Sequence, residues 1–139
     1  MKKLIKTINP INASIDIIWE LLKTGKNVDA WFPIIATCRV EGSKRYCTTE
    51  NGNIEETILT SDDKNKIFRY SFDKQDVFPA TNIIGTIKLE AISDTVTNLL
   101  WDIEFRLEDE SIFFQLKKEI EELYKSAALG LEKLANTNK

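Results

Sequence analysis

The chain has 139 residues, of which 42% are hydrophobic and 29% charged, the balance of one globular domain and not of a disordered or membrane protein. A net charge of −3, with lysine and arginine scattered along the chain, excludes the basic patch of a nucleic-acid-binding protein. The chain contains two cysteines and no histidine, which excludes Ser-His and Cys-His catalytic pairs and removes the commonest metal ligand.

The N-terminal segment predicts one strand followed by two short helices. Residues 2–8 alternate loosely between polar and apolar side chains, as a strand does. Asn12 or Ser14 can then cap a helix that continues to Leu22. Residues 27–32 predict one further short helix before the pattern changes.

The middle of the chain changes from helical spacing to the period of two that is typical of strands. The six predicted strands are residues 34–41, 44–49, 53–60, 66–73, 81–91 and 95–107. Gly42-Ser43 and Asn51-Gly52 are predicted as two-residue hairpin turns between the first three strands. Because each strand has one apolar face, we expect an antiparallel sheet that is covered on one side only.

The last segment, residues 111–136, predicts a long amphipathic helix. Its apolar positions step by three or four residues and are Phe113, Leu116, Ile120, Leu123, Ala127, Leu131 and Leu134. Gly130 interrupts this pattern, either to let the helix approach the sheet, to leave room for a ligand, or to end the helix early. A single helix cannot fill the concave side of a strongly curved sheet, so a ligand-sized space is expected between them.

The two cysteines of the chain form the first candidate site. Through the Gly42-Ser43 turn, Cys38 faces Cys47 directly across two strands. This pairing permits a disulfide or a redox switch, and the alternative is a pair of small buried thiols. Two cysteines without histidine are too few ligands for a metal site.

Arg45 and Glu56 form the sharpest candidate pair. If Asn51-Gly52 is the turn, Glu56 opposes Cys47 and lies diagonal to Arg45 on the apolar face of the sheet. Arg45 is then a candidate to orient a ligand carboxylate or enolate, and Glu56 a candidate catalytic base. The alternative is a structural ion pair that closes the sheet edge or faces solvent at the cavity mouth.

Six short motifs follow one another along nearly the whole chain. They are Ile11-Asn12-Ala13-Ser14-Ile15-Asp16-Ile17-Ile18-Trp19, Trp31-Phe32-Pro33, Arg45 followed by Gly52-Asn53-Ile54-Glu55-Glu56 and Asp62, Tyr70, Trp101, and Gly130-Leu131-x-x-Leu134. In this order they resemble the polyketide cyclase/dehydrase-like branch of the START and birch-pollen-allergen (SRPBCC) superfamily. The resemblance implies an α+β helix-grip fold, a curved seven-stranded antiparallel sheet around a long C-terminal helix, with two short helices after the first strand.

The resemblance also implies a cavity that holds a lipid, isoprenoid, hormone or polyketide. The predicted ligand-binding residues are Trp31, Arg45, Glu56, Phe68, Tyr70, Phe72, Ile87, Trp101, Ile103, Phe113, Leu116 and Ile120. For the aromatic members the alternative is ordinary core. Tyr70 is the best single candidate, because a buried phenol needs a hydrogen-bond partner that a ligand can supply. No metal or cofactor is predicted.

Three functions remain open at this point. The first is binding of a small hydrophobic molecule, and the second is a cyclase, dehydratase or isomerase that uses Glu56 with Arg45 or Tyr70. The third is a protein-interaction or co-chaperone-like role, in which a homodimer is left open. We expect one domain over residues 1–139 that acts in the cytoplasm, without nucleic acid and without stable membrane insertion, because no run of about 18 uncharged apolar residues occurs.

Overall fold

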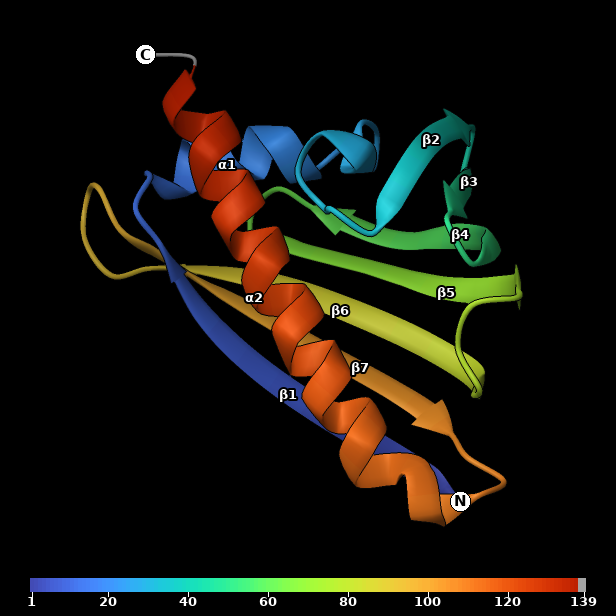
Figure 1. Cartoon of the computed structure of the whole chain (residues 1–139). Helices are drawn as coiled ribbons and strands as arrows, with labels where there is room; N and C mark the ends of the chain where they lie inside the picture. The colour runs from blue at the N-terminus through green and yellow to red at the C-terminus, as the bar shows by residue number, and fades with distance from the viewer. Residues whose placement is uncertain (138–139) are drawn as a thin grey trace.

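The computed structural model describes residues 1–137 (Figure 1). The strands are β1 (Lys2–Ile11), β2 (Ile35–Glu41), β3 (Lys44–Thr49), β4 (Gly52–Asp62), β5 (Ile67–Gln75), β6 (Thr81–Ala91) and β7 (Thr97–Arg106). The helical segments are α1 (Ile15–Leu22), the short 3-10 helices η1 (Val28–Ala30) and η2 (Glu110–Ile112), and the long helix α2 (Phe113–Thr137). None of the helices within residues 1–137 combines the length and the apolar character needed to cross a membrane.

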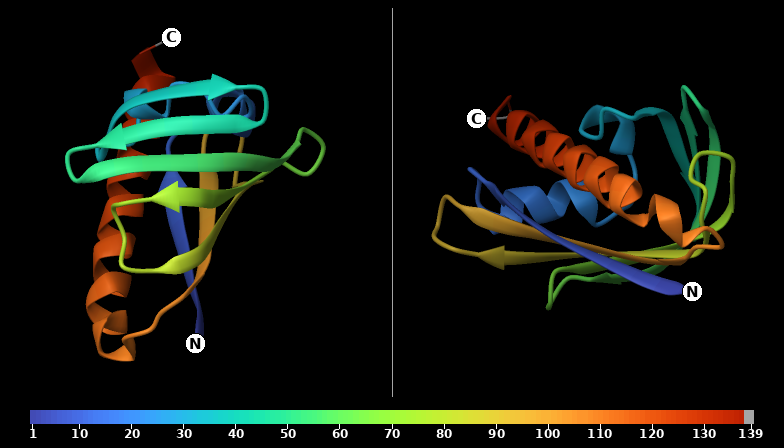
Figure 2. Two further views of the ribbon diagram at one scale, coloured as in Figure 1. Left: turned by 90° about the vertical axis from the view of Figure 1, so that its right-hand side faces the viewer. Right: turned by 60° about the horizontal axis from the view of Figure 1, so that its bottom comes forward.

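The seven strands form one antiparallel sheet in the order β1-β7-β6-β5-β4-β3-β2. The predicted α+β architecture is therefore confirmed, with β1 and β2 at the two edges. Figure 1 shows α2 crossing β1, β7 and β6, and Figure 2 shows β2 to β5 curving around toward the far side of the helix. This curvature separates the helix from one half of the sheet, and that separation positions the site.

The first two elements, β1 and α1, are explained by individual residues at their ends. The predicted cap of α1 is confirmed, because the Ser14 hydroxyl accepts a hydrogen bond from the backbone N–H of Ile17. The first strand is longer than predicted and runs through Pro10 to Ile11. β1 tolerates this proline because it is an edge strand that pairs only with β7.

The buried stripe of α2 differs in part from the predicted one. Its buried residues are Leu116, Ile120, Tyr124, Ala127, Ala128, Leu131 and Ala135. Leu123 and Leu134 are only half-buried, because the stripe advances by four residues from Ile120 to Tyr124. The predicted stripe did not include Tyr124, which lines the cavity described below.

Gly130 lies inside α2 and does not end it, so the predicted alternative of a helix break is wrong. A Cβ atom at this position would overlap the backbone carbonyl oxygen of Trp31 and lie 2.8 Å from the carbonyl carbon. The helix thus needs a glycine here to approach the loop that carries Trp31, and the close approach is to this loop, not to the sheet as predicted. This contact fixes the position of the Trp31 backbone against α2.

The register of the first hairpin is confirmed, since Cys38 pairs with Cys47. The register of the second hairpin is two residues away from the prediction, so that Arg45 lies directly opposite Glu56. The reason is the side chain of Thr49, which accepts a hydrogen bond from Asn51 N–H and donates one to the Gly52 carbonyl. These bonds place the turn one residue earlier than the Asn51-Gly52 pattern predicts.

Candidate functional site

A cavity lies between the concave face of the sheet and α2. Its volume is about 50 Å³. An engineered apolar cavity of about 150 Å³ holds benzene. A molecule of one ring therefore fits only if side chains around the cavity move outward.

Ten of the twelve predicted ligand-binding residues line this cavity. They are Trp31, Arg45, Glu56, Phe68, Tyr70, Phe72, Ile87, Trp101, Ile103 and Ile120. Phe113 and Leu116 lie outside it, because both are in the first turns of α2. The ring of Phe113 packs on Phe105, and Leu116 lines a separate void of about 10 Å³, at most the space of one water molecule.

Twelve further residues line the cavity. They are Leu21, Leu22, Lys26, Val28, Phe32, Ile34, Ile35, Cys47, Ile54, Phe78, Leu123 and Tyr124. Tyr124 could have been found from its spacing of four residues after Ile120. Phe32 and Phe78 come from the connections before β2 and before β6, and periodicity carries no signal for the placement of such segments. The half-buried members Leu21, Phe32, Ile34, Phe72, Phe78 and Leu123 form what we call the rim.

The charged groups of the cavity wall form one tight pair. Arg45 and Glu56 are 6% and 5% exposed, and Nε of Arg45 donates to Oε1 of Glu56 at 2.7 Å. The guanidinium also donates from Nη1 to the Gly25 carbonyl at 3.2 Å and lies over the ring of Tyr70. Burial works to lower the pKa of Arg45, but the charge and hydrogen bond of Glu56 raise it overall, so the guanidinium stays charged.

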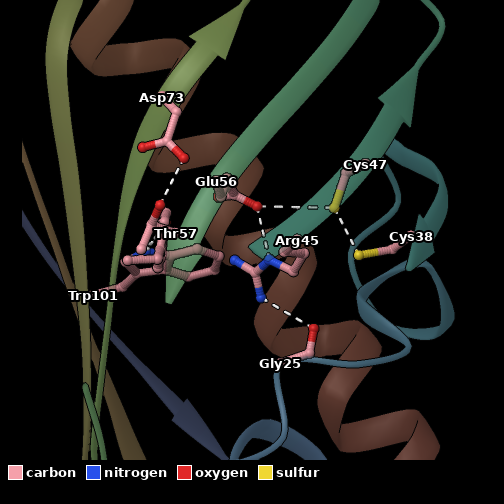
Figure 3. A network of polar contacts seen from close by, with 9 residues as sticks. Gly25, Cys38, Arg45, Cys47, Glu56, Thr57, Asp73 and Trp101 are labelled. Carbon is pink, nitrogen blue, oxygen red and sulfur yellow. Dashed lines mark hydrogen bonds and ion pairs between the residues drawn. The ribbon is translucent and has the colours of Figure 1, made fainter. Parts of the chain in front are cut away.

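Figure 3 shows the pair continuing into the two cysteines. The Cys47 thiol lies 3.9 Å from Oε1 of Glu56, and the sulfur atoms of Cys38 and Cys47 are 2.7 Å apart. Both cysteines are free thiols. The contact with Cys38 and burial raise the pKa of Cys47, whereas the contact with Cys47 lowers the pKa of the half-buried Cys38. Cys38 is thus the more easily ionised member of the pair.

An aromatic cluster forms the wall nearest α2. The ring of Trp101 stacks on Tyr124, with centroids 3.8 Å apart and planes 4° from parallel. Nε1 of Trp101 donates to the phenolic oxygen of Tyr70 at 3.0 Å. A Cβ at Gly85 would lie 2.6 Å from Cε1 of Tyr70, so the glycine makes room for this ring. Burial raises the pKa of Tyr70 and of Tyr124, and both phenols remain neutral.

A second polar cluster lies close to the first in Figure 3 but is exposed to solvent. Asp73 accepts hydrogen bonds from the Thr57 hydroxyl at 2.6 Å and from Lys44 at 2.9 Å. The hydrogen bond from Thr57, followed by that from Lys44, lowers the pKa of Asp73. Thr57 follows Glu56 directly in β4, and successive side chains of a strand point to opposite faces. The cluster therefore lies on the outer face of the sheet and takes no part in the cavity.

The fold and the site together define a helix-grip protein with a mostly apolar internal cavity. The sequence profile of the family described as polyketide cyclase/dehydrase and lipid transport matches residues 5–136. The chain belongs to this family. No curated protein sequence matches the chain significantly.

Solved structures with the same fold come from bacteria and plants. The protein XoxI from Bacillus cereus aligns with a TM-score of 0.83 at 20% identity, covering 94% of each chain. A START superfamily protein from Mycobacterium smegmatis aligns with a TM-score of 0.83 at 14% identity, covering 98% of this chain and 99% of the other. Norcoclaurine synthase from Thalictrum flavum, solved with dopamine and hydroxybenzaldehyde, aligns with a TM-score of 0.78 at 14% identity, covering 100% and 89%. At these identities the likeness establishes the START-type fold.

Proposed function

We propose that this protein binds a small, mostly apolar molecule in the cavity between the sheet and α2. The observation that carries the proposal is the cavity itself, a void walled by aromatic and aliphatic side chains in the centre of a well-packed domain. Protein interiors are normally close-packed, and a void forfeits the dispersion contacts of the atoms that line it. A bound apolar molecule restores those contacts, and burial of its surface contributes roughly 25 cal/mol per Å² before the costs of association.

The rim supports a route for such a molecule. Its side chains are half-buried and come from α1, the segment before β2, β5, the β5–β6 connection and α2. Phe32 and Phe78 lie outside the regular strands, in the connections before β2 and before β6. A molecule larger than the void can be accommodated only by displacing the rim.

Titration of the full-length chain with isopropylbenzene by isothermal calorimetry tests the proposal. We expect saturable binding of one molecule per chain. Leu123→Trp, which adds volume at the rim, should weaken this binding at least tenfold. The matched control is Leu129→Trp, the same change on the same helix at a side chain that is 61% exposed, and it should leave binding unchanged. No saturable binding, or equal binding by both variants, would contradict the proposal.

A second candidate function is a cyclase, dehydratase or isomerase, and one observation favours it. The carboxylate of Glu56 lies in the cavity wall beside Arg45, where it can reach a bound molecule. However, Arg45 already balances the charge of Glu56 and occupies its Oε1, which favours the structural ion pair over the catalytic base. Native mass spectrometry of co-purifying molecules separates the two functions. An enzyme with Glu56→Gln should retain its unconverted substrate, which is heavier by one water for a dehydratase and an isomer with a different chromatographic retention for a cyclase or isomerase. A binding protein should retain the same molecule in both forms.

A protein-interaction role is the weakest of the three. It predicts a filled core with an exposed apolar patch elsewhere, whereas a cavity lies within this core and the strongly exposed apolar side chains of α2 form no patch. Phe114 is 80% exposed and Leu129 61% exposed, but they are four helical turns apart, about 22 Å along the axis. Size-exclusion chromatography with light scattering would reveal a homodimer, which the binding function does not require.

A further inference from the structure

The three tryptophans of the chain differ in what their indole N–H groups bind. Nε1 of Trp19 donates to Oδ1 of Asp63 at 2.8 Å, and Nε1 of Trp101 donates to the Tyr70 hydroxyl at 3.0 Å. Nε1 of Trp31 has no hydrogen-bond partner among the described residues. No other buried side-chain nitrogen or oxygen of residues 1–137 lacks a partner. Trp31 is 5% exposed and lines the cavity. A buried donor without a partner is unfavourable and is rare in native proteins.

The Trp31 ring is held in place and cannot easily turn toward another acceptor. Its backbone is pressed against Gly130 of α2, where no side chain fits. The ring stacks on Phe32 with the planes 8° from parallel, and it lies 6.1 Å from the ring of Trp101, measured between centroids. The partner of this N–H must therefore come to Trp31.

The buried charges near the cavity cancel each other. Arg45 and Glu56 form a direct ion pair, so the wall carries no net buried charge. Lys26 is the remaining charged side chain of the lining and is exposed to solvent. An anionic ligand would add an uncompensated charge to a space of low polarity, which is strongly unfavourable. An uncharged ligand avoids this penalty.

We propose that the ligand of this cavity is an uncharged carbonyl compound whose oxygen accepts a hydrogen bond from Nε1–H of Trp31. The inference rests on the proposed binding function and specifies the chemistry of its ligand. An indole N–H is a donor only, so it selects an acceptor such as a ketone, aldehyde or ester oxygen. A pure hydrocarbon would leave the N–H unpaired, and a carboxylate would introduce the unbalanced charge.

Three single-ring probes of equal heavy-atom number test the proposal: acetophenone, isopropylbenzene and benzoate. They differ in one substituent, which is a ketone, an alkyl group or a carboxylate. Their affinities for the full-length chain are measured by calorimetry in the wild type and in Trp31→Phe, which keeps an aromatic ring and removes the N–H. Trp19→Phe is the matched control, because its N–H is already bound to Asp63 outside the cavity lining.

We expect Trp31→Phe to weaken acetophenone binding about tenfold relative to isopropylbenzene, the effect of one hydrogen bond to a buried donor. The ratio of the two affinities is compared between the wild type and Trp31→Phe, so that the difference in hydrophobicity between the probes cancels. Trp19→Phe should leave the ratio unchanged, and benzoate should bind more weakly than acetophenone to the wild type. Tighter binding of benzoate than of acetophenone would overturn the assignment of an uncharged ligand.

NMR spectra of ¹⁵N-labelled protein show the indole N–H signals of the tryptophans. If Trp31 had a purely structural role, its signal would not distinguish a carbonyl ligand from a hydrocarbon. The indole N–H signal that disappears in Trp31→Phe belongs to Trp31. Acetophenone should move this signal downfield, as hydrogen bonding does, and isopropylbenzene should not. If both probes bind but the ratio is unaffected and this signal does not move downfield, the inference fails while the binding function stands. If neither probe binds, the binding function itself fails.

Discussion

The sheet consists of two halves that meet α2 differently (Figure 2). The covered half is β1, β6 and β7, which lie beneath the helix, and the open half is β2 to β5, which curve away from it. In the covered half, Ile5, Leu99 and Leu131 of α2 above it are at most 1% exposed. The buried hydroxyls of Thr7 and Thr97 in this half each donate to a backbone carbonyl.

The open half contains the groups that the covered half lacks. The buried ion pair of Arg45 and Glu56 and the paired thiols of Cys38 and Cys47 all belong to β2, β3 and β4. The same curvature that removes these strands from α2 creates the cavity, and buried polar groups are retained along its wall. The comparison teaches that the covered half is close-packed against α2, whereas the open half supplies the buried ion pair and the paired thiols, and the following predictions test that difference.

The largest effect is expected from breaking the ion pair of the open half. Arg45→Met leaves Glu56 as an uncompensated buried charge and should reduce the free energy of unfolding by about 3–5 kcal/mol. The double variant Arg45→Met/Glu56→Leu removes both charges and should recover most of this loss, since well-packed apolar residues often replace a buried pair without penalty. Urea denaturation measures both. A single variant as stable as the wild type would mean that the pair is not desolvated.

Truncation should affect the covered half more than the rim of the open half. Leu131→Ala removes a fully buried side chain from a close-packed region and should reduce the free energy of unfolding by about 2–5 kcal/mol. Phe72→Ala removes a larger but half-buried side chain that borders an existing void, and the expected loss is about 1 kcal/mol. The free energies of unfolding from urea denaturation give the comparison, and a reversed order would show that the two halves are packed alike.

The order of the elements was easier to predict from the sequence than the register of each hairpin. Alternating strands and the long helix are repeated signals, so the order of elements and the single apolar face of each strand followed from them. The Gly42-Ser43 turn was predictable because its conformation depends on the turn residues themselves. The second turn was not, because the Thr49 side chain competes for its backbone groups.

The site was predictable only where strands supply it. Arg45, Glu56, Tyr70 and Trp101 face the cavity because alternation fixes which face a strand residue occupies. The missing partner of Trp31 Nε1 is a different kind of feature. It depends on how a segment outside the sheet packs against α2 and on which acceptors lie nearby. The periodicity of the sequence predicts neither of these.

Oxidation of the cysteines tests the register at the edge of the open half. Cys38 has the lowered pKa and is half-buried, so its thiolate should attack hydrogen peroxide first and Cys47 should then close the disulfide. The two thiols lose two hydrogens, and the peroxide is reduced to two water molecules. The bond closes a short loop and should raise the free energy of unfolding by up to about 2.5 kcal/mol.

The oxidised chain should be lighter by two hydrogen atoms in mass spectrometry. Cys38→Ser cannot form this bond and is the control for nonspecific oxidation. Recovery of two free thiols after peroxide treatment of the wild type would contradict the pairing of Cys38 with Cys47.

The smallest effect concerns the boundary between the halves, where Tyr124 of α2 lies beside Tyr70 of β5 in the cavity wall. Burial raises the pKa of both phenols, so the unfolded chain loses these protons first as the pH rises above about 10, the ordinary value for tyrosine. Stability should therefore be unaffected by these groups below pH 10 and should fall above it, by about 1.4 kcal/mol per pH unit for each tyrosine.

Tyr124→Phe removes one of the two groups and should reduce the steepness of this fall by that amount. Urea denaturation from pH 7 to 11 measures it, and the two proteins should have the same pH dependence between pH 7 and 9. If the variant falls as steeply as the wild type above pH 10, Tyr124 ionises as readily in the folded chain as in the unfolded one. Water would then reach the boundary between the halves, and the cavity would be open to solvent along α2 instead of being closed by it.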